Sequence, residues 1–222
     1  MVNIDKAEVL RYLGYKNQVI DDRLNKNIDD IIAETKNTIS AKYVYRLFDI
    51  SHLENGIKIE ETNMTIYSND IIKHLENCTK CILMAVTIGT DIERKIMIKQ
   101  VSSVNDALIM DACATTAVES VCDEVEMLIK SRTNLDDCRL TYRYSPGYGD
   151  FSIDYQSKLL DLLDANKKIG LFVSQSNILT PRKSVTAIIG LLDEHTNENV
   201  KLKNKCDLCM NREGCEFRKN DN

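Results

Sequence analysis

Two loops, each containing one of the two prolines of this sequence, are the segments best suited to hold a small ligand. The first runs from Arg143 to Asp150, with the letters RYSPGYGD, and follows a segment that alternates like a strand. Glycine lets a ligand approach the backbone closely, and proline stiffens the turn. An arginine can pair with a carboxylate in bidentate fashion, and tyrosines can flank a planar ring. The composition indicates a ligand-facing loop, with a plain connecting turn as the alternative.

The second loop, Leu179 to Thr186, has the letters LTPRKSVT and leads into an apolar segment expected to be a strand. Taken alone it is an ordinary turn. No G-x-G-x-x-G segment follows an expected strand, so the sequence lacks the glycine fingerprint of dinucleotide-type folds. The three histidines, His52, His74 and His195, lie in charged or loop-like settings. We therefore expect no catalytic side chain.

The cysteines suggest a second kind of chemistry. Cys206, Cys209 and Cys215 lie within ten residues among lysines and arginines, which favours thiolates. Structural zinc takes four ligands and iron–sulfur clusters usually take four cysteines, so one ligand is missing. Cys78 and Cys81 are candidates to supply it. A zinc ion or an iron–sulfur cluster is one hypothesis for this tail, and a solvated segment with reduced thiols is the other.

Irregularly ordered helices and strands must position these loops. The order favours an α+β fold over a doubly wound sheet, because strands and helices do not alternate regularly. Apolar residues at helical or alternating spacing predict the elements. They are helices over 17–39, 68–75, 104–129 and 154–165, and strands over 43–50, 57–61, 64–67, 81–88, 139–145, 168–174 and 184–191.

The composition of the chain argues against several classes of protein. The chain has 222 residues, 43% of them hydrophobic, and a formal net charge of -5, so it can bury a core and lacks the basic excess of nucleic-acid binders. The longest uncharged apolar stretch, 81–89, is about half as long as a membrane helix, and the first residues are charged where a signal peptide is apolar. We expect a cytoplasmic protein with reduced thiols, no membrane partner and no nucleic-acid partner. The expected organisation is one domain over 1–195 and a cysteine-rich tail over 196–222.

Together, the two loops resemble a known family. RYSPGYGD followed about 30 residues later by LTPRKSVTAIIG is similar to the motifs R-x-x-P-G-Y and P-x-x-S-V of the activation domain of cobalamin-dependent methionine synthase. The amino-terminal half resembles free-standing relatives of that domain through the segments EVLRYLGY, YVYRLFDI and DACATTAVESVCDEVE. The resemblance covers nearly the whole chain.

This resemblance implies a C-shaped α+β fold, with a mixed or antiparallel sheet and long packed helices. It also implies that S-adenosylmethionine binds in a shallow groove and presents its methyl group to a corrinoid held by another module. The arginine of the loop contacts the ligand in that family. Carried over by position, the groove residues are Arg143, Tyr144, Ser145, Pro146, Gly147, Tyr148, Ser184 and Val185.

The function implied is that of a stand-alone reactivation module. It would dock on a separate cobalamin-binding methionine synthase, with electrons from a donor such as a flavodoxin or ferredoxin, and support reductive methylation of cob(II)alamin. Because the chain lacks a cobalamin-binding D-x-H-x-x-G segment, it would be a component of methionine synthase activity and not a complete enzyme.

Two departures from the family keep alternatives open. The family continues its loop as G-Y-P-A-C-P, where this chain has the letters GYGDFS, and it places a tyrosine pair where this chain has aliphatic residues over 188–192. One alternative is a non-catalytic interaction or metal-sensing protein that works through the cysteine tail. Another is an activator of a different corrinoid methyltransferase.

Overall fold

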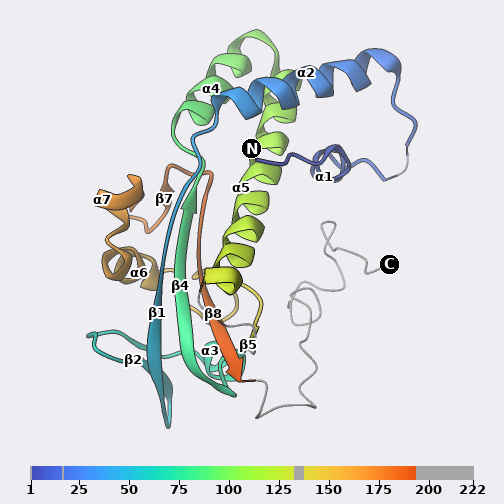
Figure 1. Cartoon of the computed structure of the whole chain (residues 1–222). Coiled ribbons are helices and arrows are strands. Elements are labelled where there is room, and N and C mark those ends of the chain that lie inside the picture. Colours follow the sequence, from blue (N-terminus) through green and yellow to red (C-terminus); the bar gives the residue numbers. More distant parts are fainter. Residues whose placement is uncertain (1, 17, 133–137, 194–222) are drawn as a thin grey trace.

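An antiparallel six-stranded sheet forms the centre of the molecule. The computed structural model describes residues 2–16, 18–132 and 138–193 (Figure 1). The strands lie in the order β3-β2-β1-β4-β8-β5, and every pairing is antiparallel. Their bounds are β1 (Lys42–Leu53), β2 (Gly56–Ile59), β3 (Thr65–Ile66), β4 (Cys78–Thr87), β5 (Cys138–Leu140) and β8 (Ser184–Asp193).

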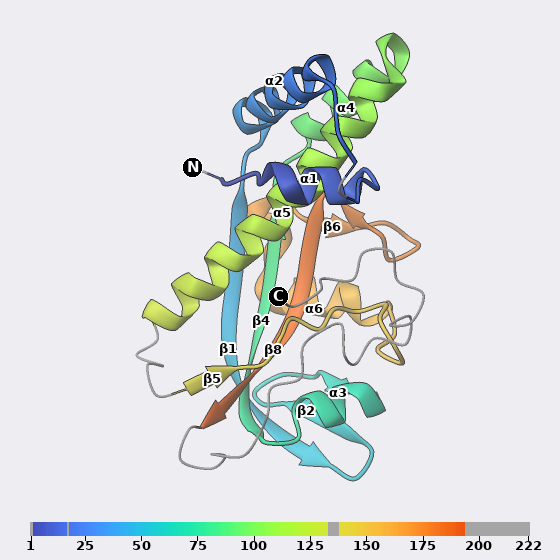
Figure 2. The same ribbon diagram turned by 90° about the vertical axis from the view of Figure 1, so that its right-hand side faces the viewer.

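Helices cover both faces of this sheet (Figure 2). The long helix α5 (Val104–Arg132) packs on one face against β4 and β8, and it contacts α1 (Lys6–Tyr12), α2 (Asp22–Thr38) and α4 (Asp91–Ser102). The opposite face carries α6 (Tyr155–Leu163) and α7 (Ala165–Ile169), with α3 (Asn69–His74) beside β2. A small second sheet pairs β6 (Phe172–Val173) with β7 (Leu179–Thr180). None of the helices in the described ranges has the length and apolar character needed to cross a membrane.

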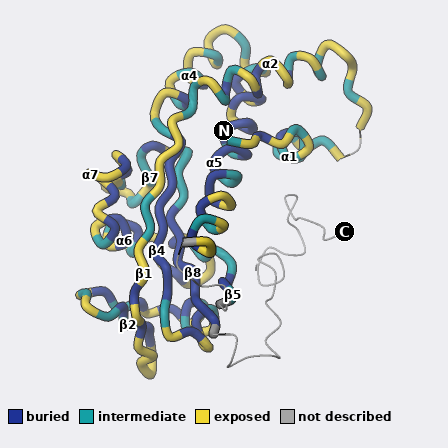
Figure 3. The backbone as a smooth tube through the Cα atoms, viewed as in Figure 1, coloured by how far each residue is buried: buried dark blue, intermediate teal, exposed yellow. Residues whose placement is uncertain are grey.

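The two neighbouring long strands β4 and β8 are buried on both faces of the sheet (Figure 3). Successive side chains of a strand point to opposite sides of the sheet. Ile82, Met84 and Val86 therefore enter the core beneath α5, while Leu83 and Ala85 enter the core beneath α6. This explains why the segment reads as an unbroken apolar run rather than an alternating one.

The mixed α+β architecture expected from the sequence is confirmed, and one expected element is wrong. A strand was expected over 168–174, but α7 extends to Ile169 and ends at Gly170, whose φ is 71°. Only Phe172–Val173 is extended. The patterns also missed α1 and α4. Helix α1 has only seven residues, and α4 leaves Met97, Ile98 and Val101 exposed, so its apolar residues do not form one stripe.

One edge of β8 is left open near the end of the sheet. Strand β5 pairs only with the far end of β8, and one further bridge joins Tyr144 to Ile188. Because backbone groups of residues two apart in a strand point to the same edge, the N–H and C=O of Thr186 face the same side as those of Ile188. Within the described part of the chain, no backbone partner meets Thr186 there. The fold thus presents a short length of unpaired strand edge.

Candidate functional site

A cavity of about 360 Å³ lies at this open edge of β8. It joins the two proline-containing loops, the start of α6 and one residue of α5. Its lining residues are Glu119, Arg143, Ser145, Pro146, Tyr148, Ile153, Gln156, Asn177, Ile178, Leu179, Arg182, Ser184, Val185 and Thr186. The two loops, whose nearest ends are Asp150 and Leu179, 29 residues apart along the chain, therefore meet at one hollow.

Six of the eight groove residues expected from the sequence line this cavity. They are Arg143, Ser145, Pro146, Tyr148, Ser184 and Val185. The two others, Tyr144 and Gly147, do not. The side chain of Tyr144 points to the opposite face of the sheet, where its hydroxyl donates a hydrogen bond to Asp70 Oδ2 at 3.1 Å and its ring lies 5.3 Å from that of His74. The separation of Arg143 from Tyr144 follows from the alternation of side chains along an extended segment.

Arg143 is held by three carboxylates of α5. One terminal nitrogen donates to Glu119 at 3.0 Å, and the other donates to Asp123 at 2.8 Å and to Glu126. The side chain is only 14% exposed. Burial alone would lower the pKa of Arg143, but Cys122 and the surrounding carboxylates outweigh it and raise the pKa. The sequence suggested that Arg143 pairs with a carboxylate of the ligand. In the structure, both terminal nitrogens of its guanidinium are instead bonded to carboxylates of α5, so Arg143 fastens the loop to this helix.

A different arginine faces the cavity without such partners. Among the described residues, Arg182 makes no ion pair, and it is exposed. Its backbone N–H donates to Glu93 of α4, as does that of Lys183 at 3.2 Å, which fixes the second loop against the helix. The peptide bond between Thr180 and Pro181 is cis. Arg182 is thus the cation that the site offers to an anionic group.

The end of the first loop is fastened to α3 by an arrangement that we call the α3 clasp, made of Ser68, Asp70, Tyr144, Gly149 and Asp150. Asp150 accepts hydrogen bonds from the Ser68 hydroxyl, the Asn69 N–H at 2.8 Å and the Asp70 N–H at 3.1 Å. Asp70 in turn accepts from the Asp150 N–H and from the Tyr144 hydroxyl, each at 3.1 Å. The loop carrying the cavity residues is therefore tied to α3 on one side and to α5 on the other.

The α3 clasp should weaken in acid. The slight burial of Asp150 would raise its pKa, but the hydrogen bonds from Ser68 and two backbone amides outweigh it and lower the pKa. A group whose pKa is lowered by folding stabilises the protein above its unfolded pKa, and this contribution disappears as pH falls through its folded pKa. We expect Asp150→Asn to lower the free energy of unfolding by about 1 kcal/mol at pH 7, and the difference from the parent to shrink as pH falls below the ordinary aspartate pKa of about 3.9. Urea unfolding across pH 3 to 7 tests this, and a pH-independent difference would contradict it.

The sequence missed the cavity residues that lie outside the two loops, above all Glu119 and Gln156. Glu119 was one carboxylate among several on a helix expected to pack. Gln156 carried a usable signal, because it shares helical spacing with Leu159, Leu160 and Leu163, all of which are buried. A polar residue in an apolar stripe either meets a polar partner or faces a cavity.

The two cysteines proposed to complete a metal site with the tail lie in an environment that disfavours metal ligation. Cys78 and Cys81 are buried in the core beneath α6, and burial raises the pKa of Cys78 to about 12 and that of Cys81 further. Metal ligation needs the thiolate, which this environment disfavours. In the described ranges no group of three or more His, Cys, Asp or Glu side chains is placed to hold a metal ion. Cys206, Cys209 and Cys215 lie outside the described residues, so a zinc or iron–sulfur site there stays a prediction.

Two further cysteines and one histidine are buried in packing positions. Cys113 and Cys122, both on α5, lie in the core between this helix and the sheet. Burial lowers the pKa of His74 to about 4, so the imidazole is neutral at physiological pH. Its Nε2 lies 3.0 Å from Thr141 Oγ1, and its ring packs edge-on against Tyr142 at 4.4 Å. These contacts give His74 a packing role.

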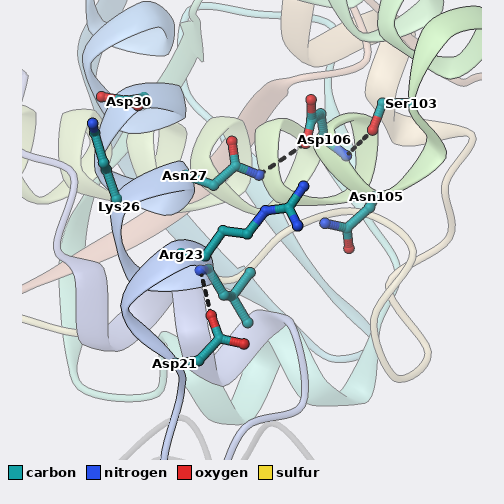
Figure 4. A pocket seen from close by; sticks show the side chains of 9 residues that line it. Asp21, Arg23, Lys26, Asn27, Asp30, Ser103, Asn105 and Asp106 are labelled. Atoms are coloured by element: carbon teal, nitrogen blue, oxygen red, sulfur yellow. Dashed lines mark hydrogen bonds between the residues drawn. The ribbon is translucent and has the colours of Figure 1, made fainter.

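A larger hollow of about 620 Å³ lies elsewhere, between the start of α2 and the junction of α4 and α5 (Figure 4). Several of its polar groups form hydrogen bonds with one another or with the local backbone. Asn27 Nδ2 donates to Asp106 at 2.9 Å, the Asp106 N–H donates to Ser103, and Asp21 accepts from the Leu24 N–H. Acidic and basic side chains alternate around it without a buried, unpartnered polar group, so it is a polar surface depression.

Comparison with known proteins gives one informative result. No protein-family model matches the sequence, and no curated protein matches it. Among solved structures, the MetH reactivation domain bound to AdoHcy (S-adenosylhomocysteine) superposes with a TM-score of 0.59 at 16% identity. The likeness covers 81% of this chain and 67% of that one. The chain shares its fold with that domain.

Proposed function

We propose that this protein binds S-adenosylmethionine in the cavity at the open edge of β8 and serves as a reactivation module for a cobalamin-dependent methionine synthase on a separate chain. The observation that carries the proposal is the meeting of the two loops at one cavity, in a fold shared with a domain whose structure holds AdoHcy. Neither loop would justify it alone.

The charges around the cavity suit this ligand. S-adenosylmethionine combines a sulfonium and an ammonium with one carboxylate. Glu119, whose side chain is 38% exposed, offers a negative charge to the cationic groups, and Arg182 offers a positive charge to the carboxylate. Opposite charges a few ångströms apart at a partly buried site attract by a few kcal/mol.

The rim of the cavity suits the other half of the ligand. Tyr148, Ile153 and Ile178 are exposed by 58%, 40% and 49% and line the hollow from three different segments. An aromatic ring and branched aliphatic side chains form the apolar walls that planar heterocycles prefer. A nucleoside placed there would keep its base between these side chains.

The chain's own contribution would be to bind and orient. When bound, S-adenosylmethionine supplies the methyl group, and the transfer is an in-line displacement that needs alignment and exclusion of water rather than a general base. A cobalamin-binding protein would bring the acceptor, and a separate donor such as a flavodoxin or ferredoxin would bring the electron.

Calorimetric titration tests the binding. We expect the parent protein to bind S-adenosylmethionine and S-adenosylhomocysteine, and Glu119→Gln to weaken S-adenosylmethionine binding about tenfold, because a charged hydrogen bond or ion pair is lost. The loss should be smaller for S-adenosylhomocysteine, which lacks the sulfonium charge.

Asp123→Asn is the matched control, because Asp123 also pairs with Arg143 but does not line the cavity. It should leave affinity within about twofold. A folded parent protein that gives no heat with either ligand at millimolar concentration would overturn the proposal, and an Asp123→Asn loss equal to that of Glu119→Gln would remove Glu119 from the site. Co-purification with a corrinoid methyltransferase tests the partner.

A further inference from the structure

A buried amide at the cavity has half of its hydrogen-bonding capacity unused. Gln156 is only 5% exposed, and it lies in the first turn of α6. Its Oε1 accepts a hydrogen bond from the Thr186 hydroxyl at 3.0 Å. No residue in the described ranges makes a hydrogen bond with its Nε2, and the residue lines the cavity. Among the described residues, Thr35 Oγ1 is the only fully buried side-chain polar atom without a partner, so the Gln156 amide nitrogen is accessible from the cavity and can donate to a ligand.

Thr186 fixes which end of the amide is available. Its hydroxyl engages Oε1, which leaves the two N–H donors of Nε2 for the cavity. The backbone of Thr186 belongs to the open edge of β8, so its own N–H also faces the hollow. Thr186 is itself only 2% exposed, which holds this arrangement rigidly. The inner wall of the cavity therefore presents a pair of uncharged donors.

We infer that Gln156 is a specificity-determining residue of this site, whose amide nitrogen donates a hydrogen bond to the uncharged nucleoside half of the ligand. The inference rests on the proposed function and adds which part of the ligand is recognised, and by which group. Thr186 is the positioning residue that orients the amide.

The positions of the charged residues favour placing the nucleoside half of the ligand against the wall formed by Gln156 and Thr186. Glu119 comes from α5, on one face of the sheet, and Arg182 comes from the loop fixed to α4. Gln156 and Thr186 lie on the other face, with α6. A ligand with a charged amino-acid end and a neutral base would place its charges near Glu119 and Arg182. Its base, with ring nitrogens that accept hydrogen bonds, would then meet Gln156.

The test uses 5′-methylthioadenosine, an uncharged nucleoside that lacks the amino-acid end, beside S-adenosylhomocysteine. We expect Gln156→Met, which keeps the length but removes the donors, to weaken both ligands by the same factor of about ten. Thr186→Val should weaken both about threefold by releasing the amide, while Thr186→Ser should stay within about twofold. A loss for S-adenosylhomocysteine alone would place the contact at the amino-acid end and overturn the inference.

Gln156→Glu separates recognition from a merely structural role. An ionised carboxyl cannot donate a hydrogen bond, whereas its protonated form can. Because position 156 is only 5% exposed, burial should raise the pKa of the introduced carboxyl above its ordinary value of about 4.3. Affinity of this variant for 5′-methylthioadenosine should therefore rise at least about threefold from pH 8 to pH 5, while that of the parent stays flat. A flat profile for the variant, or unchanged affinity in Gln156→Met, would overturn the inference and leave the proposed function standing. A parent protein that binds neither ligand would overturn both.

Discussion

Replacing Gly149 by alanine is expected to lower the free energy of unfolding by about 3 kcal/mol. Gly149 has a φ of +53°, where an L-residue costs about 1 to 2 kcal/mol. A Cβ there would also overlap the Asp70 carboxylate and approach the Tyr144 hydroxyl to 2.5 Å. Both groups belong to the α3 clasp, so the substitution would break its hydrogen bonds as well as strain the backbone. Urea unfolding monitored by circular dichroism measures the change.

Gly170→Ala is the control for the backbone term. Gly170 has a φ of +71°, but nothing lies within 4 Å of a Cβ added there. It should cost about 1 kcal/mol. In an Asp70→Ala background, Gly149→Ala should lower the free energy of unfolding by less than it does in the parent, because the Asp70 carboxylate that the new Cβ would overlap is absent. Strictly additive costs would show that the Asp70 contact is not the cause.

Arg143→Met is expected to cost about 2 kcal/mol at pH 7, because three carboxylates of α5 would lose their shared cation. Unfolding midpoints in urea at pH 7 measure the effect.

Lys183→Met is the matched comparison for Arg143→Met. Lys183 pairs with a single carboxylate, Asp111, at 2.9 Å, and its side chain is 19% exposed. Its loss should cost no more than about 1 kcal/mol. Equal costs for the two variants would mean that the carboxylate cluster has no special dependence on Arg143.

The sequence predicted the fold class and most central elements because these depend on local patterns. Short stretches of consecutive residues were enough to predict the strand around 81–88, the long helix beginning at Val104 and the helix beginning after Ser68. The segment around Gly170 shows where local patterns fail. This segment alternated like a strand, yet α7 ends at Gly170 because the chain needs a left-handed residue to close the helix.

The candidate site was predicted only in part, because a cavity depends on segments that sequence patterns treat separately. The first loop could be identified from its proline, glycines and tyrosines, and the second from its proline and from the order of the two motifs. The roles of Arg143 and Arg182 could not be predicted, because both are cations near a proline. Only the packing of α5 engages Arg143 and leaves Arg182 open. Gln156 required knowledge of what faces the apolar stripe of α6.

The unpaired edge of β8 has a consequence for how this protein can evolve. A donor supplied by the main chain is present whatever the side chain, so exchange of residues at position 186 preserves the Thr186 N–H unless proline is introduced. This hydrogen-bonding capacity of the edge depends on strand order rather than on the identity of the residue at position 186. Substitutions along this part of β8 can therefore change the side chains that line the cavity while the main-chain donor stays in place.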